Sequence, residues 1–184
     1  MTTSPQPAVF VDRDGTLMRE VNYCRDPSLV EVFEGVRQGL LALKAAGFRT
    51  VLVTNQSGIG RGNMTLEEYE AVHARLVELL GPETLDGAYM SPEAPGEPSL
   101  RRKPAPGMLL EAARDLNLDL QRSWIVGDKD IDIQCGLNAG VGGILVRTGH
   151  GASATGEAAV VVAESFALAV RWLLEKTGPG ESKP

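Results

Sequence analysis

The 184-residue chain carries a formal net charge of -6, and 43% of its residues are hydrophobic, 23% charged and 5% aromatic. That length suits one domain with a continuous core, and the acidic balance with few aromatic rings argues against nucleic acid as a partner. No apolar run is long enough to span a membrane, and residues 1–7 lack the pattern of a signal peptide. The two cysteines, Cys24 and Cys135, lack metal-type spacing, so we expect a reducing, cytoplasmic setting.

Short apolar runs alternate with helical patterns along the chain, which is typical of βαβ units and a mostly parallel sheet. The strands are expected at Ala8–Val11, Thr50–Val53, Gly87–Met90, Trp124–Val126 and Gly143–Val146. The helices are expected at Val36–Ala46, Leu66–Leu80, Met108–Leu116, Ile131–Ala139 and Phe166–Glu175. We therefore predict an α/β fold, a Rossmann-like doubly wound sheet with helices on both faces.

Local signals mark the ends of the helices and of the domain. Thr65 and Glu68 have the spacing of a capping box, and Ser165 is a candidate cap of the last helix. We expect residues 1–7 to be an N-terminal tail and 8–177 a single domain. Residues 178–184 are polar and rich in Gly and Pro, so we expect a flexible C-terminal tail there.

The segment Asp12-Arg13-Asp14-Gly15-Thr16 directly follows the first predicted strand. Two neighbouring carboxylates repel each other unless a cation lies between them or one carries a proton, so the segment indicates a metal site with acid–base chemistry. Further polar segments follow other strands, at Thr54–Gly58, Arg102–Pro104 and Gly127–Asp132. Because the carboxyl ends of parallel strands meet at one edge of a sheet, we expect these segments to converge.

Each segment also has an ordinary structural interpretation. Asp-x-Asp-Gly alone fits a turn or part of a calcium loop, although an EF-hand places its glycine later and between helices. Thr54–Gly58 alone is a polar loop, Lys103 a solvated lysine, and the acids after Gly127 a favourable start to a helix. Their occurrence in order at strand ends favours Mg²⁺ and a phosphoryl group, since carboxylate oxygens suit the metal and cations suit the phosphate.

These segments resemble the haloacid dehalogenase (HAD) superfamily, whose phosphatases carry Asp-x-Asp-Gly-Thr, a strand-end Thr or Ser, a Lys and a late Gly-Asp. The sequence is most similar to the branch of D-glycero-D-manno-heptose 1,7-bisphosphate phosphatases and histidinol phosphatases. The shared motifs stand at Asp12–Thr16, Thr54–Gly62, Arg102–Met108 and Val126–Lys129. The similarity covers most of the chain, from about residue 8 to residue 149.

The resemblance implies phosphoryl transfer through a covalent intermediate. Asp12 would attack phosphorus to form an aspartyl-phosphate, and Asp14 would act first as general acid and then as general base. Thr54 and Lys103 would hold the phosphoryl oxygens. Mg²⁺ would be bound by the Asp12 carboxylate, the Asp14 backbone carbonyl and Asp128.

The resemblance also assigns residues to substrate binding, with Asp132 as a further partner near the metal. The substrate-binding set is Glu20, Val21, Asn22, Tyr23, Asn55, Gln56, Ser57, Arg61, Arg102 and Lys129. His73 and His150 have no partner at ligand spacing, and we expect both to be structural.

Two features separate this chain from relatives of the same branch or superfamily. Members that bind zinc carry three cysteines and a histidine before Arg-Lys-Pro, where this chain has Ser91, Glu93, Ser99 and Arg101, so no zinc is expected. The spacing between Asp14 and Thr54 leaves room for one loop, one helix and one strand, and that between Asn55 and Arg102 for a helix, a strand and a short loop, so we expect no cap domain.

The predicted function is that of a Mg²⁺-dependent phosphomonoesterase acting on a small phosphorylated sugar, with heptose 1,7-bisphosphate as the leading substrate. The alternatives are histidinol phosphate and a polynucleotide 3′-phosphate. Polynucleotide phosphatases are usually joined to a kinase with a P-loop, and no GxxxxGK[ST] motif occurs here. We expect a monomer that contacts neither nucleic acid nor membrane.

Overall fold

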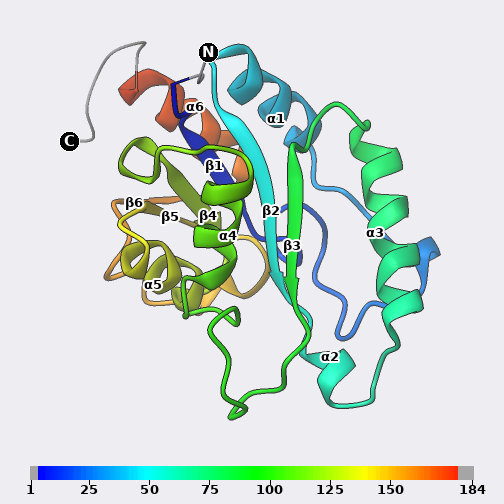
Figure 1. The fold of residues 1–184 in the computed structure, drawn as a ribbon. Coiled ribbons are helices and arrows are strands. Elements are labelled where there is room, and N and C mark those ends of the chain that lie inside the picture. Colours follow the sequence, from blue (N-terminus) through cyan, green and yellow to red (C-terminus); the bar gives the residue numbers. More distant parts are fainter. Residues whose placement is uncertain (1–3, 178–184) are drawn as a thin grey trace.

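The computed structural model describes residues 4–177, which form one parallel sheet with helices on both sides (Figure 1). The strands are β1 (Ala8–Val11), β2 (Arg49–Asn55), β3 (Gly87–Ser91), β4 (Trp124–Gly127), β5 (Gly142–Val146) and β6 (Val161–Ala163). The helices are α1 (Val36–Ala45), α2 (Ser57–Gly60), α3 (Leu66–Leu80), α4 (Gly107–Asp115), α5 (Asp130–Asn138) and α6 (Phe166–Lys176). Short 3₁₀ turns are η1 (Pro27–Leu29), η2 (Leu120–Arg122) and η3 (Gly149–Ala152).

The strand order is β3-β2-β1-β4-β5-β6, and every pair of neighbours is parallel. The chain therefore winds outward from β1 in one direction and then returns to continue from β4 in the other. Ligands of such sheets bind at the carboxyl ends of the strands where the winding reverses. In this chain that point lies between β1 and β4. The predicted doubly wound α/β fold is confirmed.

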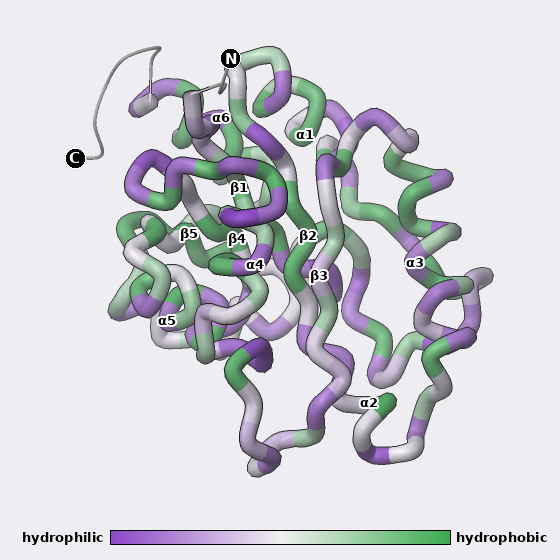
Figure 2. The backbone as a smooth tube through the Cα atoms, in the orientation of Figure 1, coloured by the Kyte–Doolittle hydropathy of each residue, from purple (hydrophilic) through white to green (hydrophobic). Residues whose placement is uncertain are grey.

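Alternate residues of each central strand face opposite layers. Val9 and Val11 belong to a core with residues of α1, α3 and α6, whereas Ala8 and Phe10 belong to a second core with residues of α4 and α5. Because both faces are covered, β1, β4 and β5 carry no charged or hydroxyl side chain, as is common in parallel sheets. Figure 2 shows the hydrophobic residues concentrated in the central strands and hydrophilic ones along much of the connecting loops.

The helix boundaries follow the local signals. At the start of α3 the Thr65 side chain accepts a hydrogen bond from Glu68 N at 3.2 Å, and Glu68 Oε2 accepts one from Thr65 N at 2.8 Å, which confirms the capping box. Ser165 caps α6 by accepting from Leu168 N at 3.3 Å. Gly47 follows the end of α1 with a φ of +89°, a left-handed conformation that favours glycine.

The structure adds strand β6 to the five predicted strands. β6 is a three-residue edge strand whose pairing with β5 begins at Ile144 and Val161.

Gln6 lies in the expected N-terminal tail, yet its N–H donates to Asn117 O at 3.1 Å, and its side chain accepts from Arg49 Nε at 2.7 Å. The boundary at residue 8 stays a prediction, and the expected tails at 1–3 and 178–184 lie outside the described residues. No helix within 4–177 has the length and apolarity needed to cross a membrane.

Candidate active site

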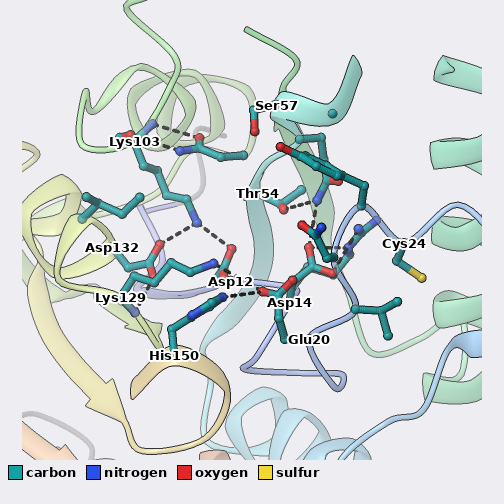
Figure 3. Close-up of a pocket in the computed structure, with 18 residues that line it drawn as sticks. Asp12, Asp14, Glu20, Cys24, Thr54, Ser57, Lys103, Lys129, Asp132 and His150 are labelled. Atoms are coloured by element: carbon teal, nitrogen blue, oxygen red, sulfur yellow. Dashed lines mark hydrogen bonds and ion pairs between the residues drawn. The ribbon is translucent and has the colours of Figure 1, made fainter. Parts of the chain in front are cut away.

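A pocket of about 210 Å³ lies at the carboxyl ends of β1 and β2 (Figure 3). Its lining includes twelve of the predicted site residues, namely Asp12, Asp14, Glu20, Val21, Asn22, Tyr23, Thr54, Asn55, Gln56, Ser57, Lys103 and Lys129. The lining also includes Arg13, Cys24, Gly58, Ile131, Asp132 and His150. Segments far apart in the chain therefore meet where the sheet topology predicts.

Lys103 lies at the centre of the buried charges. Its Nζ is 2.6 Å from Asp12 Oδ1 and 2.6 Å from Asp132 Oδ1, and it donates a hydrogen bond to Val53 O at 3.0 Å. Burial works against the charge of the lysine, but the two carboxylates outweigh it and hold the pKa of Lys103 above its ordinary value. Lys103 is therefore a fixed cation beside the predicted nucleophile.

The carboxylates around Lys103 exceed the cations that could neutralise them. Burial raises the pKa of Asp12 to about 7, with Lys103 opposing the shift and Asp132 adding to it. Burial likewise raises the pKa of Asp128 to about 6. One carboxylate oxygen from each of Asp12, Asp128 and Asp132 lies within 4.8 Å of the others, a spacing that can hold a metal ion.

The surroundings of Asp128 support a cation at this position. Its Oδ2 accepts a hydrogen bond from His150 N at 2.7 Å, while Oδ1 is buried and has no hydrogen-bond partner among the described residues. A buried oxygen without a partner is costly, and a hard divalent cation would satisfy it. The donor set of these carboxylates fits Mg²⁺.

Gly15 brings the Asp14 backbone close to Asp128. Gly15 has a φ of +82°, and a Cβ atom added there would lie 2.1 Å from Asp128 Oδ2. Any other residue would be strained and would collide with that carboxylate. The glycine of the Asp-x-Asp-Gly-Thr motif therefore lets the loop after β1 approach Asp128 in the loop after β4. That the Asp14 carbonyl is a metal ligand stays a prediction.

The Asp14 side chain is directed to a different set of partners. Arg13 donates to it through Nε at 3.0 Å and Nη2 at 3.1 Å, and Gln56 Nε2 donates to Asp14 Oδ2 at 2.9 Å. Gln56 Nε2 also lies 2.7 Å from Thr54 Oγ1. Thr54 accepts that bond with its oxygen, so its own hydroxyl hydrogen remains available to a phosphoryl oxygen.

Polar side chains from three loops form the mouth of the pocket. Glu20 Oε2 lies 3.4 Å from Lys129 Nζ and 3.4 Å from His150 Nε2 (Figure 3). Asn55 exchanges two hydrogen bonds of 3.0 Å with the backbone of Lys103, so it orients the lysine in addition to lining the pocket. His150, expected to be structural from its lack of a partner at ligand spacing, lies at the mouth of the pocket in the structure.

Comparison with known proteins agrees with this geometry. Residues 100–169 match a family model described as HAD-hydrolase-like. The D-glycero-beta-D-manno-heptose-1,7-bisphosphate 7-phosphatase of Yersinia pestis is 41% identical over 167 residues, covering 85% of this chain and 89% of that protein. The chain belongs to the HAD-type heptose-bisphosphate phosphatase family.

Other members of the heptose-bisphosphate phosphatase family match over nearly the whole chain. The D-glycero-D-manno-heptose-1,7-bisphosphate 7-phosphatase of Thermosynechococcus vestitus is 38% identical, covering 95% of this chain and 99% of that protein. The crystal structure of the D,D-heptose 1,7-bisphosphate phosphatase from B. bronchiseptica, complexed with magnesium and phosphate, superposes with a TM-score of 0.84. It is 29% identical, and the match covers 93% of this chain and 99% of that one.

Arg61 and Arg102, both assigned to substrate binding, lie outside the pocket lining. Arg102 donates from Nη1 to Glu93 O at 3.0 Å, and burial together with the nearby charge of Arg61 lowers the pKa of Arg102. Their part in substrate binding stays a prediction for this member of the heptose-bisphosphate phosphatase family. Asp128 also lies outside that lining, since its side chain is buried behind the pocket against Gly15.

The loop that precedes Arg102 is held by hydrogen bonds at the positions aligned with zinc ligands. Ser91 Oγ donates to the Glu93 carboxylate, and Ser99 Oγ accepts from Arg101 N at 3.1 Å. The pKa of Glu93 is held below its ordinary value, mainly by the hydrogen bond from Ser91. The Ser99 hydroxyl and the charge of Arg101 lower the pKa further. Two hydroxyls, one carboxylate and a guanidinium do not match the thiolate and imidazole ligands of a structural zinc site.

Arg13 was given no role by sequence reasoning, although it lines the pocket and contacts Asp14. Its position between two functional aspartates was the available signal. Arg13 lies in the turn that follows β1, where its long side chain reaches the carboxylate of the next residue, Asp14.

Proposed function

We propose that this protein is a Mg²⁺-dependent phosphatase that removes the 7-phosphate of a D-glycero-D-manno-heptose 1,7-bisphosphate. The observation that carries the proposal is the meeting of Asp12 with Lys103 and Asp132 beside Asp128, next to a pocket that Asp14 and Thr54 also line. The relatives named as 7-phosphatases support the position of the scissile bond.

The described residues account for both steps of the reaction. Asp12 attacks phosphorus, and as its bond to phosphorus forms, the bond to the sugar oxygen breaks and Asp14 gives that oxygen a proton. A water molecule then attacks the aspartyl-phosphate and transfers a proton to Asp14, which releases phosphate and restores Asp12. Lys103 and Thr54 hold phosphoryl oxygens throughout, where preorganised charges stabilise the transition state.

The carboxylates of Asp12 and Asp128 and the Asp14 carbonyl would hold Mg²⁺, which when bound offsets the repulsion between the nucleophile and the phosphate. Asp132 holds the Lys103 ammonium and also accepts a hydrogen bond from the backbone N–H of Lys129 at 3.0 Å, at the start of α5. We further propose that the protein contains no zinc, acts as a cytoplasmic monomer and does not bind nucleic acid.

Substrate contacts are proposed for residues from the loop after β1, the loop after β2 and two cationic segments. The set is Glu20, Val21, Asn22, Tyr23, Asn55, Gln56, Ser57, Arg61, Arg102 and Lys129. Lys129 lies at the pocket mouth and is paired there with Glu20. A substrate with a second phosphate can compete for that cation, which favours a bisphosphate over a monophosphate.

A substrate panel tests this function. We expect kcat/KM for heptose 1,7-bisphosphate, tried as both anomers, to exceed the values for histidinol phosphate and a 3′-phosphorylated oligonucleotide by at least about tenfold. Phosphorus NMR of the product should show loss of the 7-phosphate and retention of the 1-phosphate. Asp12→Asn serves as the inactive control. A larger kcat/KM for the oligonucleotide or for histidinol phosphate would overturn the assignment.

A further inference from the structure

Arg13 is a buried cation whose presence is not explained by the stability of the fold. It is 1% exposed, and its Nη1 has no hydrogen-bond partner among residues 4–177. Replacing a buried ion pair by apolar residues is often neutral or stabilising, so fold stability is a weak reason for such a guanidinium. Its contacts point instead to Asp14.

The guanidinium fixes the plane of the Asp14 carboxylate. Arg13 Nε donates to Oδ2 at 3.0 Å and Nη2 donates to Oδ1 at 3.1 Å, a two-point contact that a single-point cation cannot make. Gln56 Nε2 adds a second bond to Oδ2 at 2.9 Å. Within the described chain Oδ2 thus accepts two hydrogen bonds and Oδ1 one, which leaves Oδ1 the freer oxygen for a proton.

Aromatic side chains of helix α3 pack against the Arg13 guanidinium. The Tyr69 ring lies 5.4 Å from Arg13 Cζ and is itself stacked on His73, with ring centroids 5.9 Å apart. Burial and the charge of Arg13 lower the pKa of His73, so the imidazole is neutral and does not repel the guanidinium. The arginine is therefore held on one side by an aromatic pair and on the other by Asp14.

We propose that Arg13 is a positioning residue, which aims the Asp14 carboxylate so that Oδ1 exchanges protons with the leaving oxygen and the attacking water. The proposal rests on the function proposed above. In the first step the Oδ1 proton moves to the sugar oxygen as the bond from that oxygen to phosphorus breaks. In the second, water loses a proton to Oδ1 as its oxygen bonds to phosphorus and the bond to Asp12 breaks.

The leaving group provides a test that is specific for positioning. A sugar oxygen needs a proton as it departs, whereas p-nitrophenolate departs readily as an anion. We expect Arg13→Met to lower the first-turnover rate with the heptose bisphosphate by about 10²–10³-fold, in the range of general acid catalysis. The first-turnover rate with p-nitrophenyl phosphate should fall by less than about tenfold, because that step does not depend on the acid.

Conservative variants and a double-mutant cycle separate positioning from folding. Arg13→Lys keeps the charge without the two-point contact, and Arg13→Gln keeps one donor group. The first-turnover rates of both variants with the heptose bisphosphate should therefore lie between those of the wild type and Arg13→Met. In an Asp14→Asn background Arg13→Met should cause no further loss, because both changes act on the same proton transfer. Arg49→Met, which removes a guanidinium that pairs with Asp86 far from the pocket, is the matched control and should retain wild-type rates.

The outcomes distinguish a failure of the positioning role of Arg13 from a failure of the acid role of Asp14 in the proposed function. If Asp14→Asn keeps the first-turnover rate with the heptose bisphosphate, the acid role of Asp14 in the proposed function is wrong. If Asp14→Asn loses that rate but folded Arg13→Lys, Arg13→Gln or Arg13→Met keeps it, only the role of Arg13 is overturned. Equal losses with both substrates in the Arg13 variants would also reject positioning of the acid.

Discussion

Lys103 Nζ lies 2.6 Å from Asp12 Oδ1, although 91 positions of the sequence separate the two residues. The pair is buried, and Asp132 contacts the same ammonium at 2.6 Å. A lone lysine between two carboxylates leaves the cluster with excess negative charge. That imbalance suits a site that gains a divalent cation in its working state.

Removal of the Lys103 charge should damage both catalysis and stability. Lys103→Met keeps a similar length but leaves Asp12 and Asp132 without their cation. We expect kcat to fall by about 10²–10³-fold, as for other losses of a preorganised charge. The free energy of unfolding in EDTA should fall by about 3–5 kcal/mol, because one partner of a buried pair is removed. Steady-state kinetics and urea unfolding measure the two effects.

Lys44→Met is the control for that variant, since Lys44 pairs with Asp86 at 2.8 Å and does not line the pocket. Its kcat should equal that of the wild type. A Lys103→Met enzyme with unchanged kcat would show that the lysine does not contact the phosphoryl group.

Stability should depend jointly on pH and Mg²⁺. Without metal the pKa of Asp12 is about 7 and that of Asp128 about 6, both above the ordinary value of 3.8. The folded protein therefore binds more protons than the unfolded chain between these values, and the contribution of the two groups to stability is lost as pH rises from about 4 to about 7. Mg²⁺ binds the ionised form, so the rise in Tm caused by Mg²⁺ should be larger at about pH 8 than at about pH 5.

Thermal unfolding in EDTA and in Mg²⁺ at the two pH values checks this expectation. Asp128→Asn removes one of the proposed Mg²⁺ ligands and should abolish most of the Mg²⁺-dependent rise in Tm at both pH values. An equal rise at the two pH values in the wild type would contradict the assignment of these carboxylates as ligands.

The loop before Arg102 should be stable without zinc. Elemental analysis of the purified protein should find no stoichiometric zinc. Glu93→Ala removes the carboxylate that accepts from Ser91 and should lower the free energy of unfolding by about 1 kcal/mol, with faster amide exchange in residues 92–101. Glu175→Ala, at an exposed ion pair on α6, is the control and should leave that exchange unchanged. Stoichiometric zinc in the wild-type protein would refute the prediction, and its loss in Glu93→Ala would locate the metal in this loop.

Asp86 should matter for stability and not for catalysis. Its side chain is 8% exposed and accepts from Lys44 Nζ at 2.8 Å, Arg49 Nη1 at 2.8 Å and Thr50 N at 2.9 Å. These contacts lie at the amino end of β2, opposite the pocket. Asp86→Ala should lower the free energy of unfolding by about 2 kcal/mol, less than for a fully buried pair because both cations are partly solvated. An altered kcat in a folded Asp86→Ala protein would contradict this separation.

The alternation of apolar runs and helical patterns was enough to predict five of the described strands and the doubly wound arrangement. The convergence of Asp12, Thr54, Lys103 and Asp128 followed, because parallel connections bring the carboxyl ends of strands to one edge. Strand β6 was missed, although Val160-Val161-Val162 is a β-branched run bounded by Gly156 and Glu164, a signal of the same kind as that of Trp124–Val126. The structure adds that Val161–Ala163 pairs in parallel with β5 and forms an edge of the sheet.

The sequence pattern therefore accounts for which residues reach the site, since backbone topology follows from hydrophobic periodicity and turn residues. It could not show that Arg13 and Gln56 both donate to Asp14, or that the loop after β5 brings His150 to Glu20. Those contacts depend on side-chain rotamers and on the packing of α3 and η3 against the strand ends. Such interactions exist only after distant segments have folded together, because their energies are non-local and leave no periodic trace along the chain.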